Sequence, residues 1–304
     1  MAEADQMAVT LLKRLSTLET QRQTWEDLWQ DIADYVVPRK ADITVNRSPG
    51  DKRTDRLFDA TAVHAAELLS ASLHGMLTNA STPWFSLRYR DPAFDADDTA
   101  KEWLEGATEA MYKAFARSNF QEQIHELYHD LITFGTGIML VERDEEQKIR
   151  FSTRHISECF LSEDDQGRVD TVFRKFKISA RAAYARWGSA VGQRIEKMAE
   201  TDPYEEITLV HVVRPRDERD VTQYDNMNMP YQSCYLNPDE KIVLSESGFD
   251  EMPYLCPRYL KSSFELGYGR SPASSSLPDI KMLNKMSEVT IRAAQKQVDP
   301  PLMV

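Results

Sequence analysis

The stretch Asp130-Leu131-Ile132-Thr133-Phe134-Gly135-Thr136-Gly137-Ile138-Met139-Leu140-Val141-Glu142 marks a change in the spacing of apolar residues. Upstream of it, the pattern favours a helix that begins after an Asn119 cap and ends near Phe134. The Gly135-Thr136-Gly137 turn ends that helix as a glycine C-cap, and residues 138–142 then predict a β-strand. The sequence therefore predicts an α+β chain, helical before this turn and rich in strands after it.

Three further helices are predicted before the turn. The first carries an a/d heptad seam that Pro38 ends, and we favour one long helix packed on its own domain over a subunit interface. A polar loop over 40–56 and a helix over 57–78 follow, and 84–89 alternate like a short strand. Another helix begins at an Asp97 cap and ends near Arg117. The seam consists of Leu11, Leu15, Leu18, Arg22, Trp25, Trp29, Ile32 and Val36.

After the turn, seven segments with β-like patterning predict mostly antiparallel hairpins, interrupted by a helix over 179–187. These segments cover residues 138–142, 148–153, 157–161, 168–176, 206–213, 232–236 and 241–245. A long helix follows from Leu277 or Pro278 to about Val298, with Ser274, Ser275 and Ser276 as candidate caps.

Composition narrows the class of protein. The 304 residues carry 37 Lys plus Arg and 49 Asp plus Glu, a net charge of −12, which argues against broad binding to nucleic acid but allows local basic stripes. Eleven glycines form no phosphate-binding loop, and three scattered cysteines suit a reducing compartment. The sequence contains no run of about 18 apolar residues, so no contact with a membrane is predicted. No secretory signal is expected.

The strongest enzyme signal is the HExxH segment, His125-Glu126-Leu127-Tyr128-His129. In zinc hydrolases the two His bind the metal and the Glu activates water. Ile132 and Gly135 occupy the positions where one such family has Gly and His, and the next segment is predicted as a strand. We therefore favour an amphipathic helix with exposed His and Glu side chains, without metal or other cofactor. A zinc-dependent metallohydrolase using His125, Glu126 and His129 remains the alternative.

The last predicted helix has a basic stripe. At about 100° per residue, Lys281, Lys285, Arg292 and Lys296 fall within about 60° of arc, and apolar residues cover most of the rest. One interpretation is an ordinary surface helix, or one that pairs with acidic residues of an adjacent subunit. The other is a helix packed on two sides whose stripe faces a polyanion through weak contacts that do not depend on sequence.

Several local phrases, in their order along the chain, resemble the podovirus head-to-tail connector, or portal, proteins. They are Leu73-His74-Gly75-Met76-Leu77-Thr78 before Pro83-Trp84-Phe85-Ser86-Leu87, Phe120 through Phe134 before Gly135-Thr136-Gly137, Glu246-Ser247-Gly248-Phe249 before Pro253 and Pro257-Arg258-Tyr259, and Tyr268-Gly269-Arg270-Ser271-Pro272 before Leu277-Pro278-Asp279-Ile280 and Leu283-Asn284. The last group is the most specific, and the resemblance covers residues 8–304.

The resemblance implies a structural subunit without enzymatic activity. Such subunits form a ring, usually of twelve copies, at one vertex of the virion capsid after assembly in the host cytoplasm. Double-stranded DNA passes through the ring non-specifically. Terminase, scaffold or capsid protein and tail adaptor proteins are the further partners. The basic residues Lys281, Lys285, Arg292 and Lys296 would then face the DNA tunnel. A generic coiled-coil scaffold built on the 11–36 seam stays a further alternative.

The resemblance also divides the chain into regions. It implies a helical wing region over 1–137, a β-rich wing region over 138–265, a first stem helix with its entry over 266–298, and the start of a clip region over 299–304. Family members continue further, so the apolar end of the chain predicts a truncated portal subunit without most of the clip, the second stem helix and the crown.

Overall fold

The computed structural model describes residues 2–45, 47–48, 50–91, 97–146, 148–265 and 267–298, and side chains from residue 6 onward. The fold is α+β, as predicted, with two antiparallel sheets and a long helix near the end. The predicted clip start over 299–304 lies outside the described residues.

The residues group into two compact units, and each unit draws on distant parts of the chain. The first, here called the sheet unit, contains Met1–Leu28, Arg154–Tyr254 and Lys261–Gly269. The second, the helical unit, contains Trp29–Thr153, Leu255–Leu260 and Arg270–Val304. The four sequential regions expected from the sequence remain predictions.

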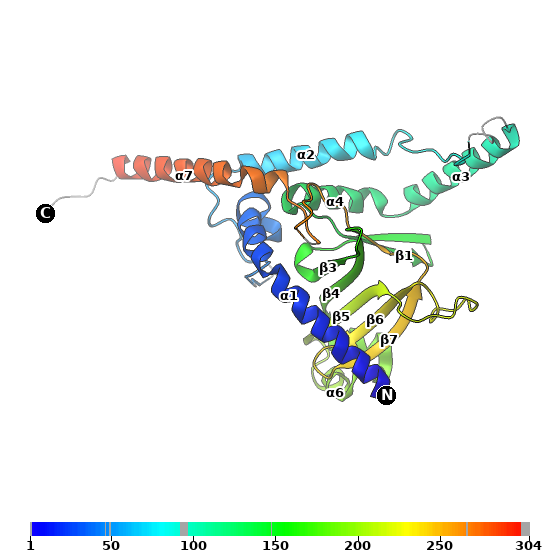
Figure 1. Ribbon diagram of the computed structural model, residues 1–304. Helices are drawn as coiled ribbons and strands as arrows, with labels where there is room; N and C mark the ends of the chain where they lie inside the picture. Colours follow the sequence, from blue (N-terminus) through cyan, green and yellow to red (C-terminus); the bar gives the residue numbers. More distant parts are fainter. Residues whose placement is uncertain are drawn as a thin grey trace. The chain divides into compact units, whose positions relative to one another are not determined.

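The sheet unit is built on a five-stranded antiparallel sheet in the order β3-β4-β5-β6-β7. Its strands lie side by side in Figure 1. Their bounds agree closely with the predicted segments. Helices α5 (Ala180–Trp187) and α6 (Gln193–Thr201) pack on one face of this sheet, where Leu209 and Leu244 of the strands join their core. The strands are β3 (Cys159–Glu163), β4 (Val169–Ser179), β5 (Glu206–Pro215), β6 (Tyr231–Asn237) and β7 (Ile242–Phe249).

Helix α1 (Ala2–Val36) covers the other face of this sheet with the first half of the predicted seam. Leu11, Leu15 and Leu18 pack against Phe173 and Val212, which point to the face opposite to that of Leu209 because side chains alternate along a strand. The favoured prediction of a long helix packed on its own domain is thereby confirmed. The seam is already covered by its own chain and is not open to a coiled-coil partner.

Arg22, the one basic residue of the seam, is buried by the same chain. Its guanidinium donates to the carbonyl oxygens of Ile156, Ser157 and Cys159 at 2.8–3.1 Å and to Glu26 at 2.6 Å. It also lies 3.7 Å from the centre of the Phe160 ring. The five N–H donors of the planar guanidinium explain why an arginine can occupy a core position here.

The helical unit holds the C-terminal end of α1, three helices upstream of the turn, a small sheet and the last helix. This small sheet has the order β2-β1-β8, in which the helical unit supplies β1, β2 and Leu255 of β8. A core of Phe120, Ile124, Leu127, Met139 and Phe151 joins α4 to β1 and β2. The elements are α2 (Thr61–Leu77), α3 (Asp98–Arg117), α4 (Phe120–Phe134), β1 (Met139–Asp144), β2 (Lys148–Thr153), β8 (Tyr254–Leu255) and α7 (Pro272–Val298).

The Gly135-Thr136-Gly137 turn, where helical spacing of apolar residues gives way to strand spacing, ends α4 as predicted. Gly135 ends α4 in the left-handed conformation, with φ of 80°. Gly137 packs so closely that a Cβ there would lie 2.5 Å from the Leu127 side chain. Asp97 caps α3 by accepting from the backbone N–H groups of Thr99 and Ala100.

Two local predictions were wrong. Asn119 makes no side-chain cap to α4; its amide instead pairs with both backbone groups of Phe151, at 2.8 and 3.0 Å. Residues 84–89 form no strand. They are held by side chains of α3, because the backbone N–H groups of Trp84 and Phe85 donate to the Tyr112 hydroxyl at 2.7 Å.

Candidate functional site

Helix α7 begins earlier than predicted because its cap is Ser271. The Ser271 hydroxyl accepts from the Ser274 backbone N–H at 2.9 Å, and the Ser274 hydroxyl accepts from the Ser271 N–H at 3.2 Å. This reciprocal pairing resembles a capping box. Ser271 also donates to the Thr133 carbonyl oxygen at 2.7 Å, which ties the start of α7 to the end of α4. The predicted caps at 274–276 were therefore placed too late.

The first half of α7 is anchored in the helical unit by Asn284. Its amide donates to the Arg56 carbonyl oxygen at 2.8 Å, and its oxygen accepts from the N–H groups of Phe58 and Asp59 at 2.7 and 3.1 Å. Leu277, on a side of α7 that is turned away from solvent, is also buried. No contact was predicted for Asn284, although a lone amide among apolar helix positions is the kind of residue that makes such contacts.

The four predicted tunnel-facing residues do not all have the same surroundings. Lys281 reaches Asp31 of α1 at 2.7 Å and lies 5.7 Å from the centre of the Tyr35 ring. Lys285 and Arg292 both pair with Glu288 of the same helix, at 2.9 and 2.6 Å. Their side chains nevertheless stay largely exposed.

Lys296, the fourth of them, is exposed near the end of the helix. Hydrogen bonding from Lys285, followed by the charge of Arg292, holds the pKa of Glu288 below its usual value against the opposing effect of desolvation. Glu288 is therefore a carboxylate within the stripe. One acidic group among Lys285, Arg292 and Lys296 leaves the stripe a net positive charge.

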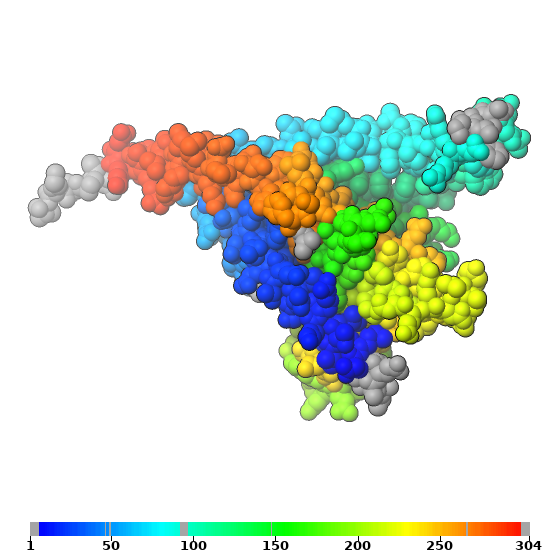
Figure 2. All heavy atoms as spheres, in the orientation of Figure 1, coloured from blue at the N-terminus to red at the C-terminus, as the bar shows by residue number. Residues whose placement is uncertain are grey.

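Apolar side chains on α7 are exposed beside this stripe. Met282 and Met286 are each 59% exposed, and Val289 is 53% exposed. Every residue from Val289 to Val298 is exposed (Figure 2). A helix end with no packed face draws no stability from tertiary contacts within its own chain.

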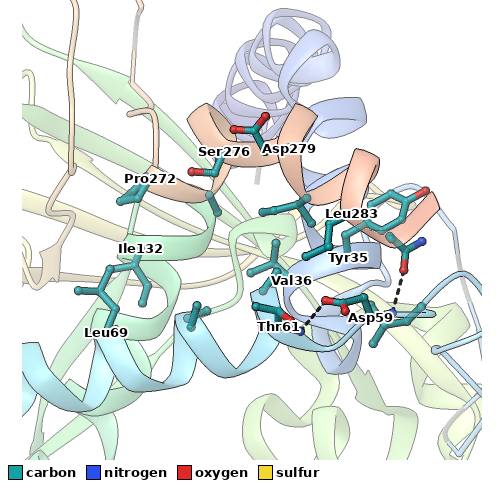
Figure 3. A pocket seen from close by; sticks show the side chains of 17 residues that line it. Tyr35, Val36, Asp59, Thr61, Leu69, Ile132, Pro272, Ser276, Asp279 and Leu283 are labelled. Carbon is teal, nitrogen blue, oxygen red and sulfur yellow. Dashed lines mark hydrogen bonds between the residues drawn. The ribbon is translucent and has the colours of Figure 1, made fainter. Parts of the chain in front are cut away.

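An open apolar pocket lies where α7, α2 and the end of α1 meet, within the helical unit (Figure 3). Its volume is about 310 Å³. Apolar residues of four helices, α1, α2, α4 and α7, converge on it, among them Val36, Leu69, Ile132, Ile280 and Leu283.

The HExxH segment lies on α4, with its Glu126 side chain already engaged. Glu126 forms ion pairs with Arg39, at 2.9 Å, and with Lys40. His129 is buried, and its neighbour Asp130 is also paired with Lys40. These basic residues come from the 3-10 turn η1 (Pro38–Lys40), far from α4 in sequence.

The charges of this cluster do not suit a zinc hydrolase. Burial opposes ionisation of Glu126, but hydrogen bonds from Arg39 and Lys40 outweigh it and lower its pKa to about 2, so it is a poor base. Burial, helped by the two basic residues, lowers the pKa of His129 to about 4. Among the described residues no three His, Cys, Asp or Glu side chains are grouped to hold a metal ion. Nothing favours the metallohydrolase alternative.

The histidines of the sheet unit, His155 and His211, make structural contacts. The buried His211 ring lies between the Tyr254 and Ser233 hydroxyls at 3.1 and 3.0 Å. His155 hydrogen-bonds to the Ser157 hydroxyl at 2.6 Å.

Across the described part of the chain, no helix combines the length and apolar character needed to cross a membrane.

Comparison with known proteins points to one family. The model of the family described as bacteriophage head to tail connecting protein matches residues 8–304. The chain is 31% identical over 299 residues to the probable portal protein of Bordetella phage BPP-1. It is 30% identical over 298 residues to the portal protein of Salmonella phage epsilon15. These matches cover 97% and 96% of this chain but 54% of each relative, so the chain spans about half the length of the curated relatives it matches.

Proposed function

We propose that this chain, which belongs to the bacteriophage head to tail connecting protein family, acts as a structural subunit of a phage portal. The family match over residues 8–304 carries the proposal. The exposed, unpacked end of α7 supports it, because such a helix end calls for further copies or partners around it.

In this proposal the chain assembles into a closed ring, usually of twelve copies in such proteins, at one vertex of the virion after assembly in the host cytoplasm. Residues 1–137 and 138–265 serve as wing regions and 266–298 as the first stem helix with its entry. Terminase, scaffold or capsid protein and tail adaptor proteins are the proposed partners. The role is structural and requires neither catalysis nor a cofactor.

Double-stranded DNA is the proposed cargo of the ring, and the basic stripe of α7 is the proposed contact. Lys285, Arg292 and Lys296 are the best placed, because Lys281 is turned toward Asp31. Repeated around a ring, three cations per copy, two of them paired with Glu288, give weak contacts to phosphates rather than tight binding. The net charge of −12 on the whole chain limits DNA contact elsewhere.

Negative-stain imaging of the purified protein tests the ring. We expect end-on views with a central channel and a single rotational symmetry. Monomers at every concentration would overturn the proposal.

A second experiment tests the DNA contact. Glutamine replacements of Lys285, Arg292 and Lys296 together should weaken binding of a mixed-sequence duplex and reduce its salt dependence. Lys177→Gln, an exposed lysine of the sheet unit, is the matched control and should change neither. Equal salt dependence in the two variants would remove these residues from the DNA path.

A further inference from the structure

One face of helix α2 is exposed and carries no charge. It is formed by Ala65, Leu68, Ser72, Gly75 and Met76, which recur at helical spacing. Leu68 is 71% exposed and Met76 is 72% exposed. The Ser72 hydroxyl is used within the helix, where it donates to the Leu68 carbonyl oxygen at 2.8 Å. We call these five residues the α2 face.

Gly75 gives this face a feature that the single chain does not explain. A glycine inside a helix is less favourable than alanine, and here no atom lies within 4 Å of where a Cβ would stand. Nothing in the described part of the chain therefore requires its small size. A glycine at an exposed, uncharged helix position does allow the backbone of another helix to approach closely.

The apolar pocket continues this face toward α7. Ala62, Ala65, Ala66 and Leu69 of α2 form one wall of the pocket, and Ile280 and Leu283 of α7 form another (Figure 3). Ala65 belongs to both the α2 face and the pocket. Together they make one mostly apolar surface that the described chain leaves open, with Asp59 and Asp279 as the charged residues of the pocket lining.

Helix α7 carries a matching uncharged stripe on another side. Met282, Met286, Val289 and Ala293 are spaced 4, 3 and 4 residues apart and are all exposed. We call these four residues the α7 stripe. On the helix the centre of the stripe lies about 90° from Leu283 and about 150° from Ile280, which line the pocket.

We infer that the α2 face and its pocket bind the α7 stripe of a second copy of this chain. The stripe cannot enter the pocket of its own chain, because it projects from a different side of the same helix that lines that pocket. Methionine side chains adapt to irregular apolar pockets, and the small residues of the α2 face admit a helix. Since the two surfaces differ, the contact is heterologous, the kind that closes into rings.

This inference rests on the proposed ring and assigns two of its contact surfaces. The pocket and stripe belong to one chain, so each copy would offer the pocket to one neighbour and the stripe to the other. The α2 face and the α7 stripe lack charge, and the charged residues that line the pocket, Asp59 and Asp279, are acidic, which disfavours DNA or an acidic partner as the occupant.

Cysteine cross-linking of mixed chains tests the pairing. One chain carries Leu68→Cys and another Met286→Cys, both with Cys256→Ser because Cys256 is only partly buried. A short bismaleimide should cross-link the mixture into a dimer at least 10-fold more than either variant alone. Tyr224→Cys, a fully exposed position in the sheet unit, replaces Leu68→Cys in the control and should give no excess. Equal yields in the test and the control would overturn the inference.

Glycine replacement gives a second, independent test. Gly75→Leu favours the helix itself but fills the space at the α2 face, so the oligomer fraction in mass photometry should fall at least 10-fold at equal concentration. Gly106→Leu is the matched control: Gly106 lies in α3, also has open space around its Cβ position, and is flanked by Glu102 and Glu109. It should assemble like the unmodified chain.

The outcomes separate the two proposals. If the unmodified protein forms oligomers and Gly75→Leu assembles equally well, the α2 face is not the contact, and the ring proposal stands. If the unmodified protein stays monomeric at all concentrations, the ring proposal fails, and with it this inference.

Discussion

Helices α1 and α7 are both long and amphipathic, yet their apolar residues have opposite surroundings. Leu15 of α1 is 4% exposed beneath the five-stranded sheet, whereas Met286 of α7 is 59% exposed. Both sequences show apolar residues at helical spacing. The difference teaches that the spacing identifies a face to be covered but not whether the same chain or another copy covers it.

The largest effect is expected at Arg22, the polar residue in the covered seam. Arg22→Ala leaves the carbonyl oxygens of Ile156, Ser157 and Cys159 without their donor and Glu26 without its partner, and should cost about 3–5 kcal/mol of unfolding free energy. Urea denaturation measures it. Arg14→Ala removes an exposed arginine of the same helix and should cost about 0.5 kcal/mol. Equal losses would mean that the seam is not a core.

The next prediction compares the two helices directly. Leu15→Ala should cost about 2–4 kcal/mol because it opens a cavity between α1 and the sheet. Met286→Ala removes an exposed side chain and should cost about 0.5 kcal/mol or less in the monomer. Thermal unfolding at low protein concentration measures both. A large loss for Met286→Ala under these conditions would show that α7 is covered within one chain.

Asn284 divides α7 into an anchored half and a free half. Asn284→Ala should cost about 1–3 kcal/mol, because the partly buried N–H groups of Phe58 and Asp59 lose their acceptor. The control is Gln295→Ala in the exposed half of the helix, for which no measurable change is expected. Chemical denaturation compares the two, and an equal response would contradict the division.

A smaller, pH-dependent effect is expected where the turn after α1 meets α4. The pKa of Glu126 is lowered from 4.5 to about 2, so its contribution to stability is complete above about pH 4.5 and is lost as the pH falls toward 2. Glu126→Gln should therefore flatten the decline of the melting temperature across this window, while leaving its slope above pH 5 unchanged. Parallel curves for the two proteins would show that the ion pairs with Arg39 and Lys40 do not form.

Local signals in the sequence predicted the elements well. The heptad seam, the Gly135 turn, the Asp97 cap and the seven strand segments depend on neighbours within a few residues, and the structure contains them. Helix α6 was missed although Ile195, Met198 and Ala199 recur at helical spacing, because nine residues give a short pattern.

Contacts between distant residues could not be predicted in this way. Within residues 84–89, the backbone N–H groups of Trp84 and Phe85 donate to the Tyr112 hydroxyl and not to a neighbouring strand. Asn119 bonds to Phe151 and does not cap its helix. Arg39 and Lys40 form ion pairs with Glu126, from which they are 87 and 86 positions distant in the sequence. Asp31 pairs with Lys281 across 250 positions. The basic stripe was visible in the sequence, but Asp31 as the partner of Lys281 was not.

Hydrogen exchange below and above the concentration of assembly tests most directly whether another copy covers α7. We predict slow exchange over residues 11–18 of α1 in both states. Residues 289–298 of α7 should exchange fast in the monomer and slowly in the assembly. Fast exchange of these α7 residues in both states, or slow exchange in both, would contradict the claim that their partner is a second copy of the chain.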